Sequence, residues 1–112
     1  MSQLADTVEE LIHKALPNYQ IYREHCVSIS NRKLFFDFCI PILKVMVEVQ
    51  GSQHSKFVGF FHGLVDNFNK SVARDNLKQE WCELHGYSLI YFDYREVPKL
   101  TEDDVKRRIV DS

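Results

Sequence analysis

The sequence predicts an α/β fold in which helices flank a central mixed sheet. Apolar residues recur at three- and four-residue steps in the first 16 residues and again from Asp66 to His85, which is the period of a helix face. Short segments rich in β-branched and aromatic residues lie between these two stretches and after the second. The order helix, three strands, helix, strand, helix predicts a meander followed by a helical crossover into a strand parallel to one of its neighbours.

The length and composition predict one domain covering residues 1–112. With 112 residues, of which 45% are hydrophobic and 27% charged, the chain can bury one small core. The first helix is expected over Ser2 to Leu16, since Pro17 and Asn18 end its periodicity. Its apolar face consists of Leu4, Val8, Leu11, Ile12 and Ala15.

Three strands are expected next, over residues 19–29, 34–40 and 45–49. The stretch "SNRK" supplies a turn after the first, Pro41 stands where the second can stop, and Gly51 closes the third. Residues 52–65 contain two glycines and three phenylalanines, and we expect a mobile or oligomer-forming segment there.

The second half of the chain predicts a long helix, a buried strand and a short helix. The long helix carries the stripe Ala73, Leu77, Trp81 and Leu84, with Trp81 expected in the core, and Gly86 suits its C-terminus. The segment "YSLIYFDY" is nearly continuous in apolar residues, as in a strand covered on both faces. Thr101 is the expected N-cap of the last helix.

Charge and cysteine usage restrict the class of protein. The formal net charge is −2, so a polyanion-binding surface must be local. Three cysteines without CxxC spacing indicate free thiols in a reducing compartment. The acidic, amphipathic N-terminus and the lack of a long apolar run predict a soluble, cytoplasmic protein without a membrane partner.

Two carboxylates interrupt the most hydrophobic runs, "LFFDFCI" and "VMVEV". If Pro41 to Lys44 is a hairpin loop, Asp37 and Glu48 are equidistant from it and face each other, with Cα atoms roughly 4.5 to 5.5 Å apart. Like charges so placed destabilise a sheet. Gln50 projects to the face of Glu48, and Val45, Val47 and Val49 project to the other. One face is thus expected to be core and the other to carry oxygens.

Protonation, or a nearby lysine or backbone donor, accounts for a single buried acid. The two acids together, beside Gln50, favour a divalent-cation site, and oxygen ligands without cysteine pairs indicate Mg²⁺ or Mn²⁺. A register slip of one residue would separate the pair to opposite faces. Glu9 borders the buried stripe of the first helix and is a third candidate acid, although an ordinary solvated carboxylate fits its position equally well.

The arrangement resembles the PD-(D/E)XK nuclease superfamily, in particular its very-short-patch-repair-like and phage or homing endonuclease branches. The resemblance covers nearly the whole chain. It rests on Asp37 and "EVQ" with ten residues between them, and on "VEELIHKAL", "FFDFCIP", "VMVEVQGSQH" and "RDNLKQEWCELHGYSLIYFDY" in that order. It implies a restriction-endonuclease-like αβββαβ(α) core.

The resemblance also implies roles for individual residues. Asp37 and Glu48 would bind the catalytic metal together with the Val49 carbonyl, with Glu9 in its inner or outer coordination shell. Gln50 stands where the family normally has lysine; glutamine holds a water by hydrogen bonds but carries no charge. Two further residues are candidates for the catalytic site. They are Lys78, which supplies the missing cation or is merely a surface lysine paired with Asp75, and His54, which contacts the phosphate or is an ordinary loop histidine.

The expected activity is metal-dependent hydrolysis of DNA phosphodiester bonds by a site-specific homing or phage-type endonuclease. A Holliday-junction or repair nuclease, or a noncatalytic DNA-binding subunit, remains the alternative. Double-stranded DNA would be covered by a homo-oligomer, with the Phe-rich segment 57–61 as its interface. The expected DNA contacts are Arg23, Arg32, Lys33, Lys56, Lys70, Arg74 and Lys78.

Overall fold

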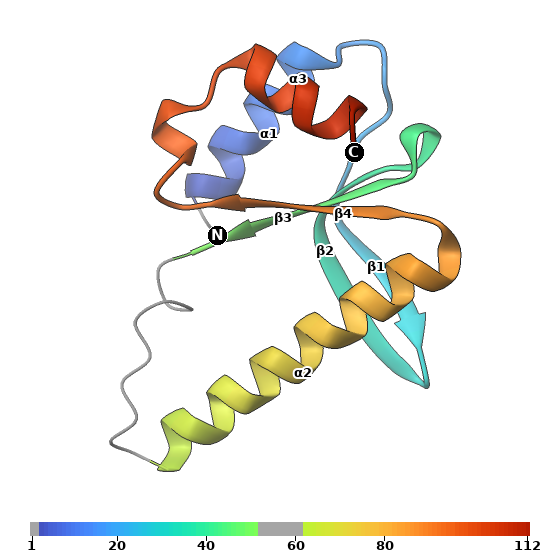
Figure 1. Ribbon diagram of the computed structural model, residues 1–112, viewed down its shortest axis with the longest axis vertical. Coiled ribbons are helices and arrows are strands. Elements are labelled where there is room, and N and C mark those ends of the chain that lie inside the picture. The colour runs from blue at the N-terminus through green and yellow to red at the C-terminus, as the bar shows by residue number, and fades with distance from the viewer. Residues whose placement is uncertain (1–2, 52–61) are drawn as a thin grey trace.

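The computed structural model describes residues 3–51 and 62–112, and the side chains of the long helix from Ala73 onward. Its elements follow the predicted order (Figure 1). The helices are α1 (Gln3–Ala15), α2 (His62–His85) and α3 (Glu102–Val110), and the strands are β1 (Tyr22–Ile29), β2 (Arg32–Ile40), β3 (Val45–Gln50) and β4 (Ser88–Asp93). Short 3₁₀ turns lie at Pro41–Leu43 and Val97–Lys99. Among the described helices, none has the length and apolar character needed to cross a bilayer.

The four strands form one mixed sheet in the order β1-β2-β3-β4. β2 pairs with β1 and β3 in antiparallel fashion, while β3 pairs with β4 in parallel. The β2–β3 register joins Phe38 to Val47 and Ile40 to Val45, which is the register predicted from a loop at Pro41 to Lys44. The predicted meander and parallel crossover are therefore confirmed.

Both faces of the sheet carry apolar clusters. Val45, Val47 and Phe92 pack against α1 and α3 on one face. Met46 packs on the other face with Trp81 and Cys82 of α2. The expectation that the Glu48 face carries oxygens instead of a core is wrong in this respect, because a second cluster lies there beneath α2. Glu48 itself is buried at the border of that cluster, 8% exposed.

The long helix differs in detail from its prediction. It begins at His62, four residues before the expected start, so residues 62–65 of the segment predicted as mobile or oligomer-forming are helical. Trp81 is buried as predicted, but Leu84 is 68% exposed and Ala73 is exposed, and Cys82 is buried in their place. The helix ends at Gly86 with a φ of 71°, the left-handed conformation that favours glycine. The rest of the segment predicted as mobile or oligomer-forming, residues 52–61, lies outside the described residues.

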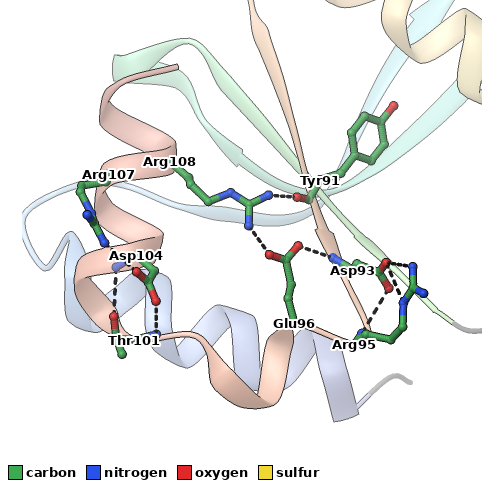
Figure 2. Close-up of polar contacts among 8 residues, drawn as sticks. All are labelled: Tyr91, Asp93, Arg95, Glu96, Thr101, Asp104, Arg107 and Arg108. Carbon is green, nitrogen blue, oxygen red and sulfur yellow. Dashed lines mark hydrogen bonds and ion pairs between the residues drawn. The ribbon is translucent and has the colours of Figure 1, made fainter.

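A network of side chains fixes α3 against the end of β4 (Figure 2). Thr101 caps α3 in a reciprocal capping box with Asp104, as its position predicted. Arg108 donates to Glu96 at 2.6 Å and to the Tyr91 carbonyl, and its guanidinium lies 4.3 Å from the centre of the Phe92 ring. These contacts hold the helix over the face of the sheet opposite α2.

Candidate metal and phosphodiester site

A change in the alternation of β2 determines where Asp37 points. Leu34 and Phe36 belong to the cluster beneath α2, whereas Phe38 and Ile40 belong to the cluster beneath α1 and α3. Because side chains two apart normally share a face, the alternation breaks between Phe36 and Phe38. The neighbouring strand β1 is irregular at the position opposite this break. Glu24, which lies between the pairs Arg23–Phe38 and His25–Phe36, has a positive φ of 52°. The break places Asp37 on the face of α2.

Asp37 and Glu48 meet across the two strands, as predicted. The Asp37 amide donates to Oε2 of Glu48 at 3.2 Å, and the Val49 amide donates to Oδ2 of Asp37 at 2.7 Å. These backbone donors offset part of the repulsion between the two carboxylates. The hairpin therefore holds two acids in a fixed relation on one face.

Lys78 supplies a cation to this pair from α2. Its ammonium forms an ion pair with Oε1 of Glu48, and the two side chains are only 12% and 10% exposed. Lys78 Nζ also lies 5.4 Å from the centre of the Phe36 ring. Of the two alternatives for this lysine, a surface position and an inward position, the structure has the inward one.

Burial raises the pKa of Glu48 from 4.5 to about 7. The Lys78 charge opposes this rise and the Asp37 charge adds to it. The carboxylate is thus poised between its protonated and ionised forms near neutral pH. Any cation that binds Glu48 competes with this proton.

The two acids line a pocket of about 200 Å³ between the sheet and α2. The remaining lining residues are Val49, Gln50, Arg74, Asp75, Lys78 and Tyr91. Three carboxylates face two basic side chains, so the fully ionised pocket carries an excess of one negative charge. An excess of negative charge favours a cation over an anionic phosphate in this pocket.

The donor set fits a hard cation. Carboxylate oxygens are the ligands that Mg²⁺ and Mn²⁺ prefer. Val49 lies beside the acids and its amide donates to Asp37, while its carbonyl as a metal ligand stays a prediction. Within residues 3–51 and 62–112, no group of three or more His, Cys, Asp or Glu side chains is placed to hold a metal. Asp37 and Glu48 are thus the two carboxylates predicted as ligands, with the Val49 carbonyl as the third. Asp75 lines the pocket but is not placed with them to hold a metal.

Several predicted site residues lie elsewhere. Glu9 accepts from Arg23 at 2.7 Å, approaches His13 at 3.7 Å and does not line the pocket. Arg23, which was predicted to contact DNA, is instead paired with both Glu9 and Asp6. Arg32 and Lys33 are exposed at the β1–β2 turn. The side chains of His54, Lys56 and Lys70 lie outside those that the structure describes.

Besides Asp75, the pocket is lined by one further residue that the sequence did not predict for the site, Tyr91. It is the partner of Glu48 in the parallel β3–β4 register, and its ring projects from β4 on the side away from Arg108 (Figure 2). Burial raises the pKa of its phenol, so the neutral hydroxyl is even further from ionising at physiological pH than that of an exposed tyrosine. The apolar run around Tyr91 made it resemble a core residue, and only the β3–β4 register identifies its neighbour.

Comparison with known proteins gives one informative similarity. No protein-family model and no solved structure matches the chain. The chain is 30% identical over 99 residues to "Uncharacterized protein 307L" of Invertebrate iridescent virus 6. The match covers 87% of this chain and 50% of the viral protein, so the chain spans about half the length of that relative.

Proposed function

We propose that the chain is a divalent-metal-dependent DNA endonuclease of the homing or phage type, related to the PD-(D/E)XK nucleases. The observation that carries the proposal is the convergence of Asp37 and Glu48 across β2 and β3, with Lys78 of α2 paired to Glu48. Two acids and one lysine around a small polar pocket are the groups that the resemblance requires. Here the lysine comes from a helix and not from the third strand.

Each pocket residue has a distinct part in the proposed hydrolysis. Asp37, Glu48 and the Val49 carbonyl would hold Mg²⁺ or Mn²⁺, which supplies Lewis-acid polarisation of the phosphodiester and a lowered pKa for the attacking water. Gln50 would orient that water through its amide, since glutamine is no useful base. Lys78 and Arg74 would offset the negative charge that develops on the phosphate.

The proposal is tested by incubating purified protein with supercoiled, linear and branched DNA in Mg²⁺ or Mn²⁺. The wild type is expected to nick or cut at least one substrate. Asp37→Asn and Glu48→Gln, which keep side-chain volume, are expected to abolish cleavage, whereas Glu102→Gln on the exposed start of α3 should not. Circular dichroism verifies that each variant is folded.

The rival function is a noncatalytic DNA-binding subunit, which the glutamine at position 50 favours. Tight DNA binding by the wild type without nicking of any substrate would support this rival and refute the nuclease. Restored or enhanced cleavage in Gln50→Lys would indicate that glutamine limits turnover in the same site. Branched DNA cut in preference to linear duplex would identify a junction or repair nuclease within the same enzyme class.

A further inference from the structure

The β1–β2 hairpin extends beyond the rest of the sheet. The β2–β3 pairs end at Phe38, whereas the β1–β2 pairs continue to Ile29 and Arg32. Figure 1 shows this hairpin leaving the β3–β4 part of the sheet. We call residues 25–36 the arm. Its last residue, Phe36, directly precedes Asp37, so the arm adjoins the candidate site.

The arm carries basic residues and no acidic residue, in a chain whose net charge is negative. Residues 25–36 contain Arg32 and Lys33 and no acidic residue. All 16 acidic residues of the chain therefore lie elsewhere, together with the other 12 of its 14 basic residues. Arg32 and Lys33 are both exposed. This charge suits a polyanion, which the net charge of the whole chain does not.

The arm has a fixed geometry. Val27, Leu34 and Phe36 are buried in the cluster that includes Trp81 of α2, so one face of the arm is anchored. Ser30 and Asn31 form the connecting turn, with φ values of 49° and 65°, and such two-residue turns match the twist of the strands they join. The backbone that carries Arg32 and Lys33 is thus anchored to the same sheet as Asp37.

We propose that this arm binds the phosphate backbone of duplex DNA about five base pairs from the pocket. Arg32 lies five positions and Lys33 four positions before Asp37. A strand advances about 3.3 Å per residue, so the backbone of these residues lies about 16 Å and about 13 Å from that of the acid along the strand. Duplex DNA rises about 3.4 Å per base pair, so the longer span corresponds to about five base pairs. The inference rests on the proposed function in taking DNA as the ligand.

The experiment measures binding without cleavage. Fluorescence anisotropy with a labelled duplex of about 20 base pairs is recorded in EDTA over a series of NaCl concentrations. The double variant Arg32→Gln/Lys33→Gln is expected to bind more weakly than wild type, and its slope of log affinity against log salt should fall by about 2 because two phosphate contacts are lost. The variant Lys99→Gln/Lys106→Gln removes the same charge from exposed positions near and on α3 and should change the slope little.

Three outcomes would overturn the inference: equal changes in both double variants, equally tight arm-dependent binding of the single strand, or no duplex binding by the wild type. Failure of the proposed function has a different signature. A protein that binds duplex through Arg32 and Lys33 but never nicks DNA would refute the nuclease and leave the arm intact. If instead the wild type cuts DNA and the Arg32→Gln/Lys33→Gln variant binds duplex as tightly as wild type, the inference about the arm is refuted and the nuclease proposal stands.

Discussion

Replacing Lys78 by methionine should destabilise the protein only above neutral pH. Lys78 and Glu48 form a buried ion pair, and the pKa of Glu48 is about 7 in the folded protein, against 4.5 ordinarily. Because this folded-state pKa is raised, Glu48 lowers stability as pH rises from 4.5 to 7, and the penalty is constant above that window. Methionine keeps the aliphatic packing of the lysine stem and removes its charge.

The size of the effect follows from linkage. Below pH 7 Glu48 is largely protonated in both proteins, so loss of the lysine costs little. Above pH 7 the wild-type carboxylate ionises, whereas the unpaired carboxyl of the variant retains its proton to a higher pH. The difference grows by about 1.4 kcal/mol per pH unit, to about 2 kcal/mol at pH 8.5. This is below the loss of about 3 to 5 kcal/mol typical of a fully broken buried pair.

Urea unfolding at pH 6 and pH 8.5 measures the effect. The same substitution in a Glu48→Gln background is the control, since no charge remains there to be stranded, and it should show no dependence on pH. A stability loss that is equal at the two pH values, or that persists in the Glu48→Gln background, would refute the assignment of Lys78 as the counter-ion of Glu48.

Three further predictions concern the site and the fold. Mg²⁺ or Mn²⁺ uptake, measured by calorimetry, should strengthen as pH rises from 6 to 8, because Glu48 must lose its proton near pH 7 to bind a cation; constant affinity would count against Glu48 as a ligand. Thr101→Ala removes the N-cap of α3 and should cost about 1 kcal/mol in urea unfolding, whereas Thr101→Asp should retain most of that stability. Arg108→Ala removes the contacts to Glu96, Tyr91 and Phe92 and should lower the free energy of unfolding by about 1 to 2 kcal/mol. The control Arg107→Ala, at a largely exposed position, should lower it by less than about 0.5 kcal/mol. Equal losses in the two variants would contradict the network.

The sequence by itself determined the element order, the hairpin register and the meeting of Asp37 with Glu48. These features follow from local rules: periods of two and 3.6 residues, a proline at the loop, and a capping threonine at α3. A hairpin register is set within the few residues of its own loop. For that reason the pairing of two acids eleven positions apart was predictable.

Only the tertiary structure decided which side chains join those acids. Periodicity placed Glu9 at the border of a helix face, but once α1 packs on the sheet Glu9 accepts a hydrogen bond from Arg23 of β1. Lys78 reached Glu48 and Tyr91 entered the pocket because the crossover of α2 and the parallel β3–β4 register bring distant segments together. The rotation and placement of a helix over a sheet depend on how both surfaces pack, and local sequence rules do not contain that information.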